Sequence, residues 1–231
     1  MSERIAWLKA LAGRFVVFDG PDGSGKSTQL QKLVRDAEAA GVEVCLVREP
    51  GGTEIGEAIR RVLLDPAVKE AIDPTCEMML FMASRAQLMA QKIRPALKRG
   101  CLVLADRFIS STLAYQGTAG GTPIDDIMRV GKVALGANWP ELVVVFDVDE
   151  ATAAARMNPL LRAGEFDGSG KDRMELKGAA FHRRVRQGYL DQAAADPQRY
   201  LVVDAAAEPG AVYSELTARL SAWCGEPKQA L

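Results

Sequence analysis

One short segment combines glycines, a lysine and three hydroxyl side chains at a spacing that suits phosphate binding. Residues 15–28 read FVVFDGPDGSGKST, and Gly20, Gly25, Lys26 and Ser27 fit the pattern G-x-x-x-x-G-K-[ST]. Glycines let consecutive backbone N–H groups turn inward around a phosphate, and the helix that follows adds the positive end of its dipole. Lys26 supplies a charge between the β- and γ-phosphates, and the Ser27 hydroxyl can ligate magnesium. The segment therefore predicts a site for a nucleoside triphosphate.

Such a P-loop binds nucleotides in many protein classes, so it does not by itself name a function. Here it follows a stretch that reads as a strand and precedes one that reads as a helix, as the chemistry requires. The residues expected to surround the phosphates are those of the loop and the start of the helix: Gly20, Pro21, Asp22, Gly23, Ser24, Gly25, Lys26, Ser27 and Thr28. A second motif must decide what happens to the bound nucleotide.

Two further segments place charged residues directly after apolar stretches. Residues 44–47 are followed by Arg48, in the run REPGGT, and residues 102–105 are followed by Asp106 and Arg107. Ligands of an open α/β sheet bind at the carboxyl ends of its strands, so these side chains should flank the P-loop. Asp106 can orient a magnesium-bound water, and the two arginines can hold a second phosphate by forked hydrogen bonds. An exposed ion pair explains either arginine alone equally well, but two at two strand ends favour a phosphate site.

These residues come together only if the strands before them lie in one parallel sheet, and the rest of the chain predicts such a sheet. Five short apolar segments read as strands: 15–18, 43–47, 102–105, 142–146 and 200–203. Several are almost continuously apolar, as expected for strands buried on both faces of a parallel sheet. Stretches with helical periodicity lie between or after them: 27–40, 75–99, 150–158, 176–195 and 211–222. The alternation predicts an α/β protein of three layers, with a five-stranded parallel sheet flanked by helices.

The composition excludes several classes of protein. The chain has 231 residues, 48% hydrophobic and 26% charged, with a formal net charge of -1. This length can bury a core without disulfides, and the near-neutral charge argues against binding nucleic acid or a membrane surface by bulk electrostatics. Cys45, Cys76, Cys101 and Cys224 show no C-x-x-C spacing, which favours buried, reduced thiols over a disulfide framework or a zinc site. Because no apolar run could span a bilayer and residues 1–13 lack a signal-peptide pattern, we expect a cytoplasmic protein.

One segment differs in composition from the rest of the chain. Residues 162–171 read RAGEFDGSGK, and three glycines with a serine indicate a flexible loop. Helix-forming sequence resumes at once, so this loop is not a linker between domains. We therefore predict a single domain over residues 1–231, with an N-terminal extension at 1–13 and a mobile flap at about 157–175.

Taken together, the motifs closely resemble those of the thymidylate kinase family. The resemblance rests on REPGGT at 48–53, DRF at 106–108, STLAYQG at 111–117 and DRME at 172–175, and it extends from about Arg14 to Val203. It implies the P-loop NTPase fold and the transfer of the γ-phosphoryl group of ATP to dTMP with Mg²⁺. This reaction lies in the pathway that supplies dTTP for DNA synthesis. Members of the family are typically homodimers, so the resemblance implies a homodimer here too.

The resemblance assigns the acceptor nucleotide to residues on two segments. Phe81 would stack on the thymine ring and Arg85 would bond its edge, although the helix pattern alone favours core packing for Phe81. Thr112 and Gln116 would face the base or the sugar. Tyr115 would crowd the 2′ position of the sugar and so favour a deoxyribose.

The acceptor phosphate and the metal are assigned in the same way. Arg48 and Arg107 would bind the monophosphate, in a pocket shaped by Pro50. Asp22 would reach toward the acceptor sugar and the metal region. The candidate magnesium residues are then Ser27, Asp106 and Asp22.

The flap after Arg156 resembles the lid of this family. Arg156 would lie near the adenine and complete the ATP site, and Arg162 and Arg173 would meet the transferring phosphoryl group. The loop between Gly20 and Lys26 has no basic residue, which is similar to the subgroup whose lid supplies the extra charge. The expected catalytic residues are Lys26, Arg107, Arg162 and Arg173.

Two departures from the family pattern affect these assignments. The strand before the P-loop ends in Asp19, where the family more often has Glu, which would alter a contact behind the site. Residues 167–171 resemble an insertion in the lid. This leaves open whether Arg162 or Arg173 reaches the phosphates.

The chemistry implied for this acceptor needs no catalytic base. A phosphomonoester has a second pKa near 6, so its oxygen is largely dianionic at neutral pH and can attack directly. The only histidine, His182, lies beside Arg183, Arg184 and Arg186 in a stretch that reads as a solvated helix face. We therefore interpret His182 as a surface residue.

Three other functions were weighed against this one. A kinase for another nucleotide, such as guanylate, would share the P-loop but not REPGGT or YQG. A P-loop motor or regulatory subunit is suggested by VVVFDVDE at 143–150, but the chain has no basic stripe for nucleic acid. A GTPase is disfavoured because no N-K-x-D motif is present. Dependence of ATP consumption on an added monophosphate or on DNA would separate these functions.

Overall fold

The computed structural model describes residues 2–156 and 172–225 of the chain. Its centre is a five-stranded sheet in the order β2-β3-β1-β4-β5, with every neighbouring pair parallel. The strands are β1 (Phe15–Asp19), β2 (Val44–Arg48), β3 (Leu102–Asp106), β4 (Leu142–Asp147) and β5 (Tyr200–Asp204). All five predicted strands are confirmed, each to within one residue at either end.

The helices alternate with these strands along the chain. They are α1 (Ser2–Ala10), α2 (Lys26–Ala39), α3 (Glu54–Leu64), α4 (Pro74–Leu88), α5 (Arg94–Lys98), α6 (Ile109–Thr112), α7 (Ile124–Leu135), α8 (Glu150–Arg156), α9 (Ala179–Ala195) and α10 (Pro209–Gly225). Two π-helical segments, η1 (Met89–Ile93) and η2 (Leu113–Ala119), continue α4 and α6. No helix in these two ranges is long and apolar enough to cross a membrane.

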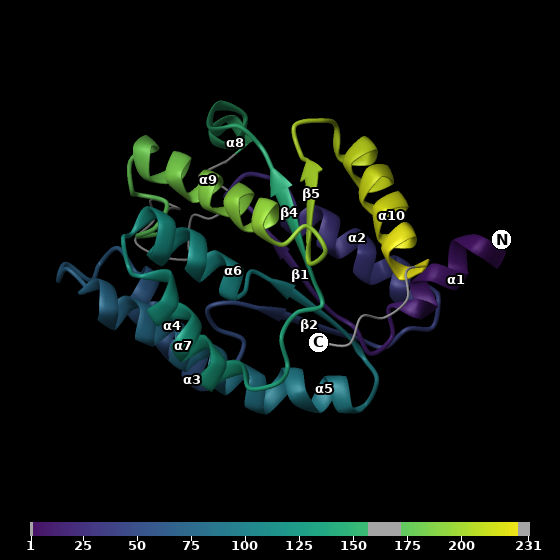
Figure 1. Ribbon diagram of the computed structural model, residues 1–231, viewed down its shortest axis with the longest axis horizontal. Helices are drawn as coiled ribbons and strands as arrows, with labels where there is room; N and C mark the ends of the chain where they lie inside the picture. The colour runs from purple at the N-terminus through teal and green to yellow at the C-terminus, as the bar shows by residue number, and fades with distance from the viewer. Residues whose placement is uncertain (1, 157–171, 226–231) are drawn as a thin grey trace.

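Helices cover both faces of the sheet and give three layers, with α4 and α7 together on one side and α2 and α10 on the other (Figure 1). Two hydrophobic clusters fill the spaces between the layers. Phe15 and Val17 of β1 belong to one cluster, and Val16 and Phe18 belong to the other, as the alternation of side chains along a strand requires. This is the P-loop NTPase fold that the sequence predicted.

The predicted helix at 75–99 is one helical run with an interruption. α4 passes through η1 into α5, which has Pro95 in its first turn. Because proline has no backbone N–H, the α-helical hydrogen bond at this position cannot form, and the chain takes a wider turn. The methionines divide: Met78, Met82 and Met89 are in the core, whereas Met79 is 54% exposed.

Four helical segments were missed by the sequence analysis. These are α1, α3, α7 and the run α6–η2. The extension at 1–13 contains α1, and it contributes to the core because Leu8 and Leu11 are buried beside α10. The predicted helix at 176–195 begins later, at Ala179, and the part of the helix at 150–158 beyond Arg156 lies outside the described residues. All four cysteines are free, but the expected burial is correct only for Cys101: Cys45 and Cys224 are partly buried, and Cys76 is exposed because it lies on the solvent side of α4.

Candidate active site

The loop between β1 and α2 has the backbone that phosphate binding requires. Gly20, Gly23 and Gly25 have φ values of 131°, 78° and 84°, a region that residues with a Cβ rarely adopt. A Cβ on Gly20 would also lie 2.5 Å from the carbonyl oxygen of Phe146, so β4 leaves room only for glycine there. The Ser24 hydroxyl is buried and has no hydrogen-bond partner within the described part of the chain. An orphaned hydroxyl inside such a loop fits an anionic ligand.

Lys26 is the first residue of α2 and folds back over the loop. Its Nζ donates hydrogen bonds to the carbonyl oxygens of Gly20 at 3.1 Å and Pro21 at 2.9 Å. The pKa of Lys26 is lowered to about 8, first by burial and then by nearby Arg107, against the opposing effect of the acidic neighbours. The ammonium group is therefore short of compensating negative charge, which a triphosphate would provide.

The side chains of Ser27 and Asp106 contact each other at the carboxyl ends of the inner strands β1 and β3. β1 and β3 pair directly, with Phe18 opposite Asp106, so the end of β3 lies beside the start of α2. The Ser27 hydroxyl donates to Asp106 Oδ2 at 3.0 Å. One hydroxyl and one carboxylate suit Mg²⁺, which takes its remaining ligands from water and phosphates rather than from a protein cage. In keeping with this, no group of three or more His, Cys, Asp or Glu side chains in the described ranges could hold a metal.

A single cavity of about 760 Å³ joins the phosphate loop to the second cationic segment. It is lined by seventeen of the residues expected at the site: Asp22, Gly23, Ser24, Gly25, Lys26, Ser27, Thr28, Arg48, Pro50, Phe81, Arg85, Asp106, Arg107, Thr112, Tyr115, Gln116 and Arg156. Gly20 and Pro21 do not line the cavity, but their carbonyls accept hydrogen bonds from Lys26, which does. The sequence motifs therefore converge on one space.

A buried ion pair between Arg85 and Glu49 lines this cavity, as does Phe81. Arg85 Nε and Nη2 approach Glu49 Oε2 at 2.7 and 2.6 Å, and Nη2 also donates to the Thr112 hydroxyl at 3.1 Å. The guanidinium lies over the ring of Phe108, 5.0 Å from its centroid. Burial acts to raise the pKa of Glu49, and the ion pair with Arg85 opposes the rise. Phe81 is half-buried at the cavity wall, so both packing and ring stacking are open to it.

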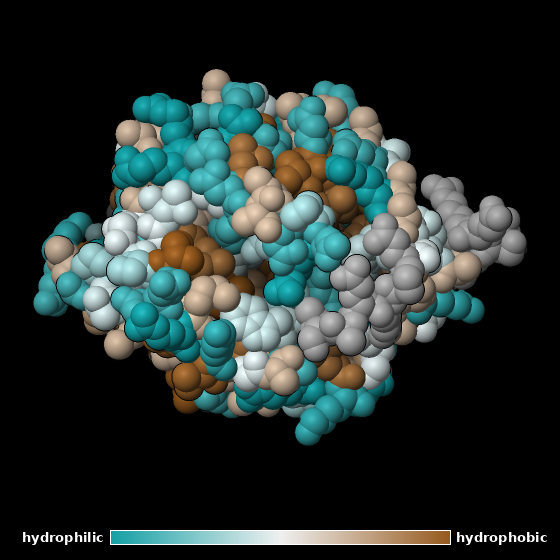
Figure 2. Space-filling model, in the orientation of Figure 1, coloured by the Kyte–Doolittle hydropathy of each residue, from teal (hydrophilic) through white to brown (hydrophobic). Residues whose placement is uncertain are grey.

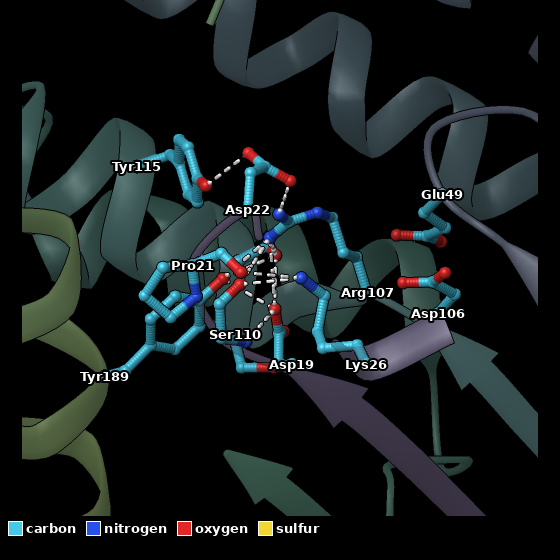
Figure 3. Close-up of polar contacts among 12 residues, drawn as sticks. Asp19, Pro21, Asp22, Lys26, Glu49, Asp106, Arg107, Ser110, Tyr115 and Tyr189 are labelled. Atoms are coloured by element: carbon cyan, nitrogen blue, oxygen red, sulfur yellow. Dashed lines mark hydrogen bonds and ion pairs between the residues drawn. The ribbon is translucent and has the colours of Figure 1, made fainter. Parts of the chain in front are cut away.

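Arg107 faces the P-loop in the middle of the cavity (Figure 3). Its Nη2 lies 2.5 Å from Asp22 Oδ1, and the Tyr115 hydroxyl donates to Asp22 Oδ2 at 3.2 Å. Burial raises the pKa of Tyr115 well above its usual value, so the phenol keeps its proton. Asp22 thus joins the acceptor side of the cavity to the P-loop.

The other expected acceptor residues complete the wall. Arg48 is half-exposed and lies 3.5 Å from Glu57, while Pro50 contributes a carbonyl that accepts from Arg60 at 3.1 Å. Gln116 is buried, and its amide donates to Glu77 at 2.8 Å. Of these, Arg48 has the most freedom to reorient toward a phosphate.

Three arginines were expected at the lid and the adenine. Arg156 donates to the carbonyls of Ala205 and Ala206, beside the segment after β5 that lines the donor end of the cavity. Arg173 does not line the cavity: its Nη2 donates weakly to the Glu70 carbonyl at 3.4 Å. Arg162 lies outside the described residues.

The sequence analysis missed several residues that line the cavity. Polar ones among them are Gln29, Glu49, Arg60, Ser111, Asp172, Glu175 and Glu208. Four of them stood within the quoted motifs REPGGT, STLAYQG and DRME without being assigned, so their signal was present: Glu49, Ser111, Asp172 and Glu175. Arg60 lies on α3, which was not predicted. Burial raises the pKa of Asp172, with Asp22 adding to the rise, so this carboxylate lies in a partly desolvated, acidic corner of the site.

A P-loop enzyme that moves a phosphoryl group between two bound molecules needs a second cationic pocket opposite its phosphate loop, and the fold and cavity assign the chain to this class. Comparison with known proteins narrows the class. The chain belongs to the thymidylate kinase family, because the family model described as thymidylate kinase matches residues 18–216.

Similar proteins agree with this family. Thymidylate kinase of Desulforudis audaxviator is 44% identical over 213 residues, which cover 92% of this chain and 92% of the relative. Thymidylate kinase of Deinococcus radiodurans is 44% identical over 90% of this chain and 97% of its own length. The crystal structure of thymidylate kinase from Ehrlichia chaffeensis matches with a TM-score of 0.69 at 28% identity, covering 90% of this chain and 98% of that chain. The family resemblance in the sequence is confirmed.

Proposed function

We propose that this chain transfers the γ-phosphoryl group of ATP to dTMP, giving dTDP and ADP, in the supply of dTTP for DNA synthesis. Family membership supports this activity. The single observation that carries it is the continuity of one cavity from Lys26, at the phosphate loop, to Phe81 and Arg85, at the expected base site. A donor and an acceptor nucleotide can therefore lie end to end in the same space.

The reaction is an in-line displacement at phosphorus. An oxygen of the dTMP phosphate forms a bond to the γ-phosphorus as the bond to the bridging oxygen of ADP breaks. The attacking oxygen carries no proton at neutral pH, so catalysis depends on alignment and on neutralising charge. His182 does not line the cavity, which agrees with a reaction that needs no histidine base.

We assign the charge neutralisation first to Lys26 and Arg107. Lys26 would leave its carbonyl partners for the β- and γ-phosphates, and Arg107 would bind the acceptor phosphate together with Arg48. Arg162 and Arg173 stay candidates for the transferring group, and Arg173 would have to leave the Glu70 carbonyl to reach it. Tyr115 would lie against the sugar, with Asp22 beside it.

Mg²⁺ is the metal that these residues fit. The Ser27 hydroxyl and the Asp106 carboxylate would hold it and its waters at the phosphates, and Asp22 is a third candidate. When bound, such an ion neutralises charge on the phosphate oxygens. The protein's part is to hold Ser27 Oγ and Asp106 Oδ2, which lie 3.0 Å apart, together at the carboxyl ends of the strands.

We also propose that the chain forms a homodimer through the face made by α3, α4 and α7. These helices pack side by side and leave large apolar side chains exposed: Ile55, Val62, Met79, Ile124 and Val133. Figure 2 shows apolar side chains at the lower left, where Figure 1 places α3 and α7, as well as left of the centre and at the upper centre of this face. A second copy would cover this patch, and sedimentation of Val133→Asp as a monomer would support it. A cytoplasmic location and the absence of nucleic-acid and membrane partners stay predictions.

The function is tested by ADP release from magnesium-ATP across nucleoside monophosphates and DNA. We expect strong stimulation by dTMP and little by GMP, AMP or the ribose analogue of dTMP. Stimulation by GMP instead would keep the phosphate loop and remove the acceptor assignment of Phe81 and Arg85. Stimulation by DNA would favour a motor or regulatory subunit.

A further inference from the structure

Asp19, the last residue of β1, is a fully buried carboxylate that the reaction above does not use. Its Oδ1 accepts hydrogen bonds from the Tyr189 hydroxyl at 2.5 Å, the Ser111 hydroxyl at 2.7 Å and the Gly20 N–H at 3.1 Å. Its Oδ2 accepts from the Ser110 hydroxyl at 2.6 Å (Figure 3). Since a buried carboxylate is costly unless donors compensate, these four donors hold Asp19 in one orientation.

The same cluster holds one nitrogen of the Arg107 guanidinium. Nη1 lies 3.1 Å from the Tyr189 oxygen, 3.1 Å from the Ser111 oxygen and 3.4 Å from Asp19 Oδ1. The other nitrogen, Nη2, contacts Asp22 of the P-loop instead (Figure 3). The buried Asp19 cluster therefore holds Nη1, while Nη2 is directed toward the P-loop in the cavity.

Arg107 requires such support from its surroundings. Its backbone φ is 66°, in the left-handed region that is unfavourable for a residue with a Cβ. A residue in this conformation persists when its neighbours over-determine it. The Asp19 cluster supplies that constraint at the side chain.

Tyr189 reaches the cluster because α9 packs closely on η2. A Cβ on Gly188 would lie 2.9 Å from the Thr118 side chain and 3.2 Å from the Ala114 backbone, so glycine permits this approach. Tyr189 is fully buried, and its ring meets that of Tyr115 edge to face with centroids 6.4 Å apart. Its hydroxyl donates to Asp19 and accepts from Arg107 at the same time, which only one orientation of the phenol allows.

We propose that Tyr189 is a positioning residue, whose hydroxyl, bonded to Asp19, fixes the Arg107 guanidinium where it binds the phosphate of the acceptor nucleotide. The inference rests on the proposed function, in which Arg107 binds that phosphate. Without the hydroxyl, Nη1 loses an acceptor and the guanidinium can turn further toward Asp22. The acceptor would then have to compete with a stronger ion pair, which lowers its affinity.

The test compares Tyr189→Phe with a control variant that removes another tyrosine hydroxyl bonded to α9. Tyr200 donates to Gln192 of α9 at 2.9 Å, so Tyr200→Phe removes a hydrogen bond to α9 without touching Asp19 or Arg107. We expect Tyr189→Phe to raise KM for dTMP about tenfold while KM for ATP stays within about twofold. Tyr200→Phe should change neither constant.

Equilibrium binding distinguishes positioning from a general loosening of the site. Thymidine has the base and sugar of dTMP but no phosphate. Tyr189→Phe should weaken dTMP binding about tenfold and leave thymidine binding unchanged. In an Arg107→Met background the substitution should have no further effect, because the residue through which it acts is gone. Ser111→Ala, which removes another contact to both Asp19 and Arg107, should show the same pattern.

Each result decides the matter. Equal weakening of dTMP, thymidine and ATP would show that Tyr189 only supports the fold, and so would an additive effect in the Arg107→Met background. An unchanged KM for dTMP in Tyr189→Phe would overturn the positioning role while leaving the proposed function standing. A wild-type protein that does not phosphorylate dTMP would overturn both.

Discussion

Glu49 Oε2 and Arg85 Nη2 lie 2.6 Å apart at the wall of the cavity, and the two side chains are only 3% and 1% exposed. A buried ion pair of this kind contributes little net stability over an apolar pair, but removing one partner leaves a buried charge without compensation. The pair therefore fixes the direction of Arg85 more than it stabilises the fold. The effect of the pair on stability and its effect on the orientation of Arg85 can be measured separately.

We expect Glu49→Ala to lower the free energy of unfolding by about 3–5 kcal/mol, because Arg85 is left unpaired. The double variant Glu49→Leu/Arg85→Met should recover most of that loss, since both charges are gone, yet bind dTMP weakly. Urea unfolding and dTMP titration measure the two effects. A Glu49→Ala protein within about 1 kcal/mol of the wild type would contradict the buried pair.

Lys26→Ala should remove catalysis without unfolding the protein. The substitution removes the charge at the β- and γ-phosphates, so we expect kcat to fall about 10³-fold or more. The free energy of unfolding should not fall, because burial already disfavours the charge on this lysine. Lys32→Ala, on the same helix, is the control and should keep its activity. Normal turnover of Lys26→Ala would remove the phosphate-loop assignment.

The pH dependence of stability follows from the same lysine. Its pKa is about 8 in the folded protein and 10.5 ordinarily, so between these values the unfolded chain binds more protons. Stability should therefore rise with pH across this window, relative to Lys26→Met, and the penalty on the charge is fully present below about pH 8. Urea unfolding of both proteins at several pH values measures the difference. A constant difference from pH 7 to pH 10 would show that Lys26 does not titrate there.

Tyr115 provides a test of sugar selection. Its ring is 6% exposed at the cavity, and its hydroxyl contacts Asp22. Tyr115→Ala opens the space beside the sugar and should reduce the preference for dTMP over its ribose analogue by about 10- to 100-fold in kcat/KM. Tyr115→Phe keeps the ring and should keep the preference. An equal loss of preference in both variants would assign selection to the hydroxyl instead.

The sequence predicted the sheet and the phosphate loop well because both depend on local signals. β1, β3 and β4 are buried along almost their whole length, so each reads as an unbroken apolar run. The loop depends on residue types at fixed spacing, and the structure brings these to one cavity. α3 and α7 also had signals that were not used: Thr53 caps α3 through Gly56 N–H, and acidic residues occupy the first turn of both helices.

Contacts between distant residues could not be predicted in this way. Asp19 and Tyr189 are 170 positions apart, and only the packing of α9 on η2 brings them together. Arg173 occurs in a recognisable motif, yet its direction depends on the end of α3 and the segment that follows: its N–H donates to the Leu64 carbonyl and its Nη2 to the Glu70 carbonyl. No spacing rule contains that information.

The N-terminal helix gives the last prediction. Leu11, directly after α1, is fully buried in the cluster that includes α2 and α10, and Arg14 pairs with Glu141 at 2.6 Å just beyond it. Leu11 and Arg14 precede the region matched by the family model, yet Leu11 completes the core. We expect Leu11→Ala to cost about 2–5 kcal/mol in urea unfolding, with kcat retained at temperatures where the protein is folded. Lys9→Ala, on the exposed face of α1, should change neither, and a similarly small effect of Leu11→Ala would mean that α1 is not part of the cooperative fold.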